Sequence, residues 1–168
     1  FFFFSRVLFR SCAYACYVKG YTTTQDAERD DEIATLMKGC LAEASEGIRA
    51  EFHPTLEQLE MVGCSMKAKE EEVERISRVA ENPVRKLGRH DRLTGAAMYC
   101  LKHGIEPVNI AKAIAYGLAY DNREDPNAVR MQEMIAEKGI RPAAARILGI
   151  SEEEKLMNMV MEEYDRLK

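Results

Sequence analysis

The segment from Val108 to Leu118 is apolar on every face that a helix would present. Only Asn109 and Lys112 interrupt its apolar character, which comes from Val108, Ile110, Ala111, Ala113, Ile114, Ala115 and Leu118. A helix without a polar face is stable in a globular protein only when other elements cover it on all sides. The segment therefore predicts a central helix around which the rest of the chain packs.

The surrounding segments have the patterns of amphipathic helices with defined ends. From residue 31 to about residue 50, apolar residues recur at intervals of three and four. Asp91 and Gly104 mark the ends of a later helix, and Asp125 with Pro126 marks the start of the next. Ser151 followed by residue 154, a glutamate, has the spacing of a capping box for the last helix.

The same residues argue against any sheet. The chain has no G-x-G-x-x-G motif and no strand-like runs of Val and Ile, and its 168 residues correspond to about one domain. Helices joined by short turns predict a single all-α domain, which we expect over residues 12–168.

The first eleven residues differ from everything that follows. Five of the six phenylalanines lie within FFFFSRVLFRS, which has neither the basic start nor the cleavage site of a signal peptide. We expect residues 1–11 to be a non-native, read-through segment. The native protein would then extend further upstream, and this chain would be a fragment of it.

Composition excludes several functional classes. A formal net charge of -4 argues against a general nucleic-acid binder, and no apolar run approaches the roughly 18 residues of a membrane span. The five cysteines form no C-x-x-C pair, which favours a reduced, cytoplasmic protein over a disulfide scaffold. The three histidines lack the spacing of a helical zinc pair, so we expect no metal site.

A short basic segment is the strongest candidate for chemistry. It contains Arg85, Lys86, Arg89, His90 and Arg92, with Asp91 as its single acid, and we expect residues 84–92 to form a loop. Guanidinium groups bind phosphate or carboxylate through paired hydrogen bonds. The same cations could equally pair with surface acids such as those of residues 70–74, and such exposed pairs contribute little.

Three motifs follow in order along the chain. Residues 78–93 have the pattern R-V-x-x-x-P-x-R-K-L-x-x-x-D-R-L, and residues 13–20 are close to A-Y-x-G-Y-x-K-G. Residues 121–129 and 137–139 contain a late D-P-x-A-V and E-K-G pair. In this order and register, the motifs resemble those of the polyol-specific long-chain dehydrogenases, in particular the mannitol-1-phosphate 5-dehydrogenases. The resemblance covers about residues 12–150.

This resemblance implies both a fold and a reaction. The fold is a multi-helical C-terminal substrate-binding domain like those of 6-phosphogluconate-dehydrogenase-like enzymes, and an N-terminal Rossmann domain binds NAD. The reaction converts D-mannitol 1-phosphate and NAD to D-fructose 6-phosphate and NADH without a metal. The family's catalytic lysine, asparagine and histidine precede the A-Y-x-G-Y helix, where this chain has residues 1–11. No catalytic or cofactor-binding residue is therefore assigned here, and the fragment is expected to be inactive.

The resemblance also gives the basic segment a role. Arg85, Lys86 and Arg92 match the family motif and are implied to hold the phosphate of a sugar phosphate. Arg78 matches as well, and two further candidates, Arg89 and His90, lie at variable positions of the motif. The partners implied are the substrate and the Rossmann domain, with neither nucleic acid nor membrane. The alternative is a stand-alone helical module that binds protein or anions without catalysis.

Overall fold

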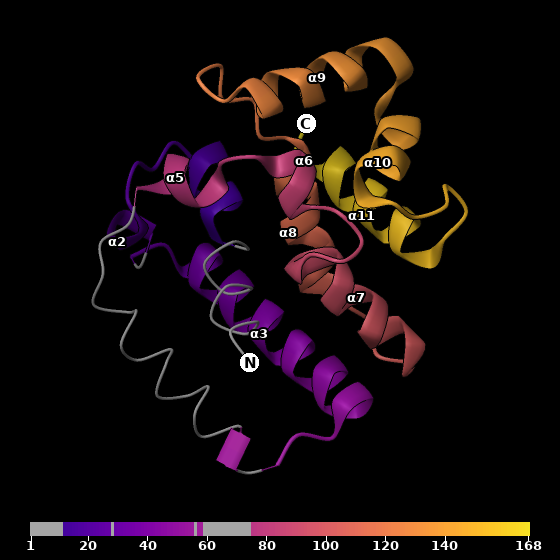
Figure 1. Ribbon diagram of the computed structural model, residues 1–168. Helices are drawn as coiled ribbons and strands as arrows, with labels where there is room; N and C mark the ends of the chain where they lie inside the picture. Colours follow the sequence, from indigo (N-terminus) through magenta and orange to yellow (C-terminus); the bar gives the residue numbers. More distant parts are fainter. Residues whose placement is uncertain (1–11, 28, 56, 59–74) are drawn as a thin grey trace.

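The computed structural model describes residues 12–27, 29–55, 57–58 and 75–168, and every regular element in these residues is a helix (Figure 1). An isolated antiparallel bridge joins Thr23 to Arg75. The prediction of an all-α fold is therefore confirmed. The expectation for residues 1–11 lies outside the described residues.

The helices follow one another with short connections. Residues 12–18 are helical. The labelled helices are α2 (Thr24–Ala27), α3 (Asp31–Phe52), α5 (Ile76–Ala80), α6 (Pro83–Lys86), α7 (Arg92–Lys102), α8 (Val108–Leu118), α9 (Pro126–Lys138), α10 (Ile140–Leu148) and α11 (Lys155–Arg166).

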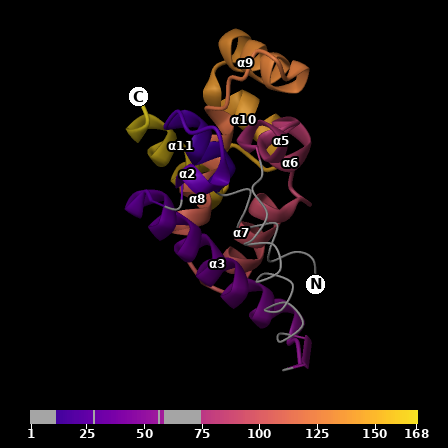
Figure 2. The same cartoon turned by 90° about the vertical axis from the view of Figure 1, so that its left-hand side faces the viewer.

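Helix α8 lies at the centre of the packing, as its apolar sequence predicts. It contacts α3, α7 and α11, while α9 packs against α10 and α6 (Figures 1 and 2). Its residues from Ile110 to Leu118 are buried except for Lys112. Full burial of an Ile or Leu side chain contributes about 1.5–3 kcal/mol, so this helix is a main source of stability.

Most of the predicted helix ends are correct. The side chains of Asp91 and Asp125 accept backbone N–H groups at the starts of α7 and α9, and Gly139 ends α9. The capping box predicted at Ser151 is wrong, because α11 begins at Lys155. The Ser151 hydroxyl instead accepts the N–H of Glu153 within the preceding turn.

A carboxylate from α3 caps the central helix. Pro107, which precedes α8, offers no side-chain hydrogen bond to it. Glu43 accepts the backbone N–H groups of Asn109 and Ile110 at 2.9 Å each and the Asn109 side-chain amide at 2.6 Å. A negative charge at this helix end also interacts favourably with the helix dipole. Glu43 thus fixes α3 against the start of α8.

Two glycines let α3 approach its neighbours closely. A Cβ atom added at Gly47 would lie 2.7 Å from the Sγ atom and 2.9 Å from the backbone nitrogen of Cys100 in α7. A Cβ atom added at Gly39 would meet the Asn109 side chain at 2.3 Å. Glycine is required at Gly47 in particular, since backbone atoms of α7 cannot move aside as a flexible side chain can.

We expect Gly47→Ala to destabilise the fold by about 1–3 kcal/mol, the usual range for overpacking, although alanine is the better helix former. Glu46→Ala, an exposed change at the preceding position of α3, should alter stability by less than about 0.5 kcal/mol. Urea unfolding of both variants measures the difference. Equal stabilities would contradict the close approach of α3 and α7.

The cap on α8 gives a second expectation. Glu43→Ala leaves two backbone N–H groups without their acceptor and should cost about 1.5–3 kcal/mol in the free energy of unfolding. Glu43→Gln keeps one acceptor oxygen and should cost less. A loss no larger than that of Glu46→Ala would show that the cap contributes nothing.

Candidate functional site

The predicted basic loop contains a short helix. We expected residues 84–92 to be a loop, but Pro83–Lys86 form α6, so the prediction is wrong for residues 84–86. The Asn82 side chain accepts the N–H of Arg85 at 3.2 Å, and proline is favourable at the first position of a helix. Arg85 and Lys86 therefore project from a defined turn.

A buried carboxylate holds the start of this turn. Asp125, only 5% exposed, accepts the backbone N–H of Asn82 at 2.7 Å and that of Asn127 at 2.9 Å. Asn82 itself has a left-handed backbone, with φ of 59°. One side chain therefore caps α9 and fixes the entry to α6, although the two positions lie 43 residues apart. The sequence predicted only the cap.

Two core contacts anchor the other end of the basic segment. Leu87 is fully buried, and its side chain packs against α8 where Gly117 leaves room for it. The buried Thr94 hydroxyl donates a hydrogen bond of 2.6 Å to the Leu87 carbonyl. The basic segment is therefore held at both ends by the core.

The structure brings Arg85 and Arg92 together on one carboxylate. The Arg85 Nη1 atom lies 3.6 Å from Oδ2 of Asp91, and the Arg92 Nη1 atom lies 3.5 Å from Oδ1. The Arg85 side chain is 60% exposed, whereas that of Arg92 is 19% exposed. Among the described residues, two guanidinium groups thus face the same carboxylate.

The other predicted residues lie around this pair in different directions. The Lys86 ammonium donates to the Val79 carbonyl of α5 at 2.9 Å, and Arg78 is exposed on α5. Arg89 turns toward α10 and α11, where its Nη1 atom donates to the Gly149 carbonyl at 3.3 Å and lies 3.5 Å from a Glu154 carboxylate oxygen. The structure thus joins Lys86 to α5 and draws Arg89 away from the Arg85–Arg92 pair.

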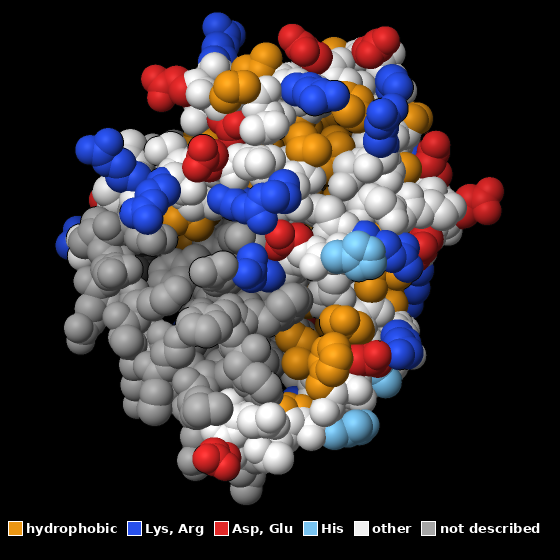
Figure 3. All heavy atoms as spheres, in the orientation of Figure 1, with side chains coloured by type: hydrophobic (Ala, Val, Ile, Leu, Met, Phe, Trp, Pro, Cys, Tyr) orange, Lys and Arg blue, Asp and Glu red, His pale blue; other side chains and the backbone are white. Residues whose placement is uncertain are grey.

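The last predicted residue, His90, is exposed and lies beside a surface pocket. This pocket has a volume of about 580 Å³ and is lined by Arg89, His90, Gly95, Met98, Tyr99 and Lys102. On the face shown in Figure 3, Lys and Arg side chains gather over α5, α6 and α9, with Asp and Glu side chains among them. The predicted set therefore forms a basic surface around one compact pair of arginines, and not a single closed pocket.

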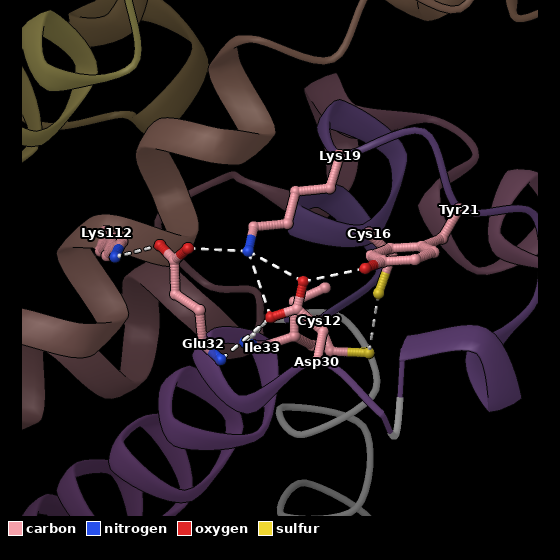
Figure 4. A network of polar contacts seen from close by, with 8 residues as sticks. All are labelled: Cys12, Cys16, Lys19, Tyr21, Asp30, Glu32, Ile33 and Lys112. Atoms are coloured by element: carbon pink, nitrogen blue, oxygen red, sulfur yellow. Dashed lines mark hydrogen bonds and ion pairs between the residues drawn. The ribbon is translucent and has the colours of Figure 1, made fainter.

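A second polar network lies where residues 12–20 meet α3 (Figure 4). The Lys19 ammonium bonds both carboxylate oxygens of Asp30, at 2.9 and 3.1 Å, and Glu32 at 2.7 Å. Glu32 also pairs with Lys112 of α8 at 3.0 Å, and the Tyr21 hydroxyl donates to Asp30 at 3.0 Å. We call these five residues the clamp. They give Lys19, the lysine of the A-Y-x-G-Y-x-K-G motif, a structural role.

The clamp changes the pKa values of its members. Hydrogen bonds from the Lys19 side chain and the Ile33 backbone N–H lower the pKa of Asp30 to about 2, and the Tyr21 hydroxyl adds to this effect. Burial opposes the charged form of Lys19, but Glu32 and Asp30 together raise the pKa of this ammonium above its ordinary value. The ion pair is therefore fully charged near neutral pH.

The cysteines in the described residues lie in the core. Cys12, Cys16, Cys40 and Cys100 are buried. Contact with Cys12 and burial raise the pKa of Cys16, which keeps it protonated. No group of three or more His, Cys, Asp or Glu side chains in this part of the chain could hold a metal ion. Among these residues, no helix has the length and apolar character of a membrane span.

The structure is that of a helical domain in which a short turn, held at both ends by the core, carries several basic side chains. The chain matches the family of mannitol dehydrogenase C-terminal domains over residues 10–168, and it belongs to this family. The family resemblance of the three motifs is thereby confirmed.

Several curated relatives carry the same enzyme name. The chain is 36% identical over 152 residues to the mannitol-1-phosphate 5-dehydrogenase of Bacillus licheniformis, covering 89% of this chain and 40% of that protein. It is 33% identical over 159 residues to that of Caldanaerobacter subterraneus subsp. tengcongensis, covering 93% and 41%. For Clostridium acetobutylicum the identity is 31% over 159 residues, with coverage of 93% and 41%. The chain therefore spans about two-fifths of the length of these relatives.

The lowered pKa of Asp30 gives a pH-dependent expectation. A carboxyl group with a depressed pKa in the folded state stabilises the fold above its unfolded pKa of about 3.9, and this stabilisation is lost as the pH falls through its folded pKa. Asp30→Asn keeps a good helix cap but removes the charge. The unsubstituted chain should be more stable than Asp30→Asn at pH 7, and the gap should close between about pH 4 and pH 2. Thermal unfolding across this range measures the gap, and a constant gap would contradict the assigned pKa.

Proposed function

We propose that this chain is the helical substrate-binding part of an NAD-dependent mannitol-1-phosphate 5-dehydrogenase. The observation that carries the proposal is the similarity of about nine-tenths of the chain to several enzymes of that name. The reaction would interconvert D-mannitol 1-phosphate and D-fructose 6-phosphate in the cytoplasm. The sugar phosphate is the ligand that this part of the enzyme would bind.

The basic segment is the proposed site for the phosphate group. Arg85 and Arg92 lie within reach of one carboxylate, so a phosphate could bridge the same two guanidinium groups. Lys86 projects from the same turn as Arg85 and adds charge. Arg78, Arg89 and His90 form the basic surroundings and contribute through the longer-range field. Fixed ends on both sides reduce the entropy lost when the segment binds a ligand.

NAD would be bound by a part of the enzyme that this chain does not include. The described residues contain no strand followed by a glycine-rich turn and a helix, which is the arrangement that holds the pyrophosphate of a dinucleotide. They therefore do not fit the cofactor. The family resemblance implies that the catalytic residues precede the A-Y-x-G-Y helix, where this chain has residues 1–11, so the chain by itself should bind the sugar phosphate without turning it over. The partner is the Rossmann domain, and no metal is required.

The test measures the dissociation constants of sugar phosphates for the chain by nuclear magnetic resonance titration. The unsubstituted chain should bind fructose 6-phosphate and mannitol 1-phosphate more tightly than neutral fructose. Arg85→Ala or Arg92→Ala should weaken binding of both sugar phosphates by about 10- to 100-fold, because each removes a charge-assisted hydrogen bond.

The matched control is Arg130→Ala, which removes the same charge from an exposed position of α9. It should change the dissociation constant by less than about twofold, because solvent and salt screen an exposed charge that does not contact the ligand. A chain that binds no sugar phosphate, or binds it equally well in all three variants, would favour the stand-alone interaction module instead.

A further inference from the structure

Asp91 lies between the two arginines that are proposed to bind the phosphate. Its two carboxylate oxygens face different arginines, with Oδ2 toward Arg85 at 3.6 Å and Oδ1 toward Arg92 at 3.5 Å. Both distances exceed those of a good charge-assisted hydrogen bond, which lie near 2.7–2.9 Å. The carboxylate therefore offsets part of the positive charge of the arginines but does not hold them in tight paired hydrogen bonds.

The fold keeps this carboxylate in place. Oδ1 of Asp91 accepts the backbone N–H of Arg92 at 2.7 Å and so caps the start of α7. The Asp91 side chain is only 13% exposed. Rotation away from the arginines would break the cap, so Asp91 remains a neighbour of any anion that binds to them. The cap alone does not need a negative charge, since asparagine serves as well at such positions.

We propose that Asp91 is an internal competitor of the phosphate group, whose charge lowers the affinity of the site for its anion. The inference rests on the proposed function, because it concerns the same pair of arginines. A site with two guanidinium groups and one fixed carboxylate attracts an anion less strongly than the arginines alone would. Weaker binding of the phosphate favours release of the product after each turnover.

If Asp91 acts through its charge, the effect of removing that charge depends on the charge of the ligand. A purely structural role would not give this dependence. Repulsion by Asp91 scales with the charge of the ligand, so it acts about twice as strongly on a dianion as on a monoanion. Methyl phosphate carries close to two negative charges at pH 8, whereas dimethyl phosphate carries one. The energy gained on removing the Asp91 charge should therefore be about twofold greater for methyl phosphate.

The experiment compares these two probes by titration of the full 168-residue chain at pH 8. Asp91→Asn removes the charge and keeps the cap. It should tighten methyl phosphate binding by about tenfold and dimethyl phosphate binding by about threefold, as expected for a charge about 5 Å away in a water-like dielectric. Asp91→Ser, which also caps helices and is neutral, should give the same pattern.

The control Glu153→Gln removes one negative charge from an exposed loop residue before α11 and should leave both affinities unchanged. Unchanged or weaker binding in Asp91→Asn, while Arg85→Ala still weakens binding, would overturn the role of Asp91 and leave the phosphate site standing. Equal tightening of both probes would also overturn it. If the unsubstituted chain and Asp91→Asn bind neither probe, the phosphate site itself fails.

Discussion

The burial of α8 on all sides is the constraint on which the rest of the structure depends. Because this helix has no polar face, α3, α7 and α11 must all contact it, and they leave little freedom in how they cross. Gly39 lets α3 approach Asn109 of α8, and Gly47 lets it approach Cys100 of the neighbouring α7. On another side, Gly117 admits Leu87 and so links the central helix to the basic segment.

Carboxylates organise the ends of the helices around this core. Glu43 caps α8 from a different helix, Asp125 caps α9 while holding the entry to α6, and Asp30 caps α3 while binding Lys19. Each of these side chains accepts backbone N–H groups and also joins two distant parts of the chain. Three acidic side chains of this protein therefore serve to join and cap its helices.

Asp91 belongs to the same group but has a further consequence. It caps α7 as the others cap their helices, yet its neighbours are the two arginines proposed to bind phosphate. The capping requirement of one helix and the charge of the proposed site are thus set by one side chain. Replacement of Asp91 by a neutral cap residue would therefore change the charge of the proposed site and keep the cap of α7.

The sequence by itself determined the all-α fold, the central helix, the ends of most helices and the family, since helical period, caps and motifs are local properties of the chain. It failed at residues 84–86 and at Ser151, where short turns depend on neighbours. Only the tertiary structure decided which charges meet. It drew Arg89 toward α11, gave Lys86 a carbonyl partner in α5, and placed Asp91 between two arginines. A periodic pattern specifies the buried face of a helix, but the partner of a surface charge is fixed only when the helices pack.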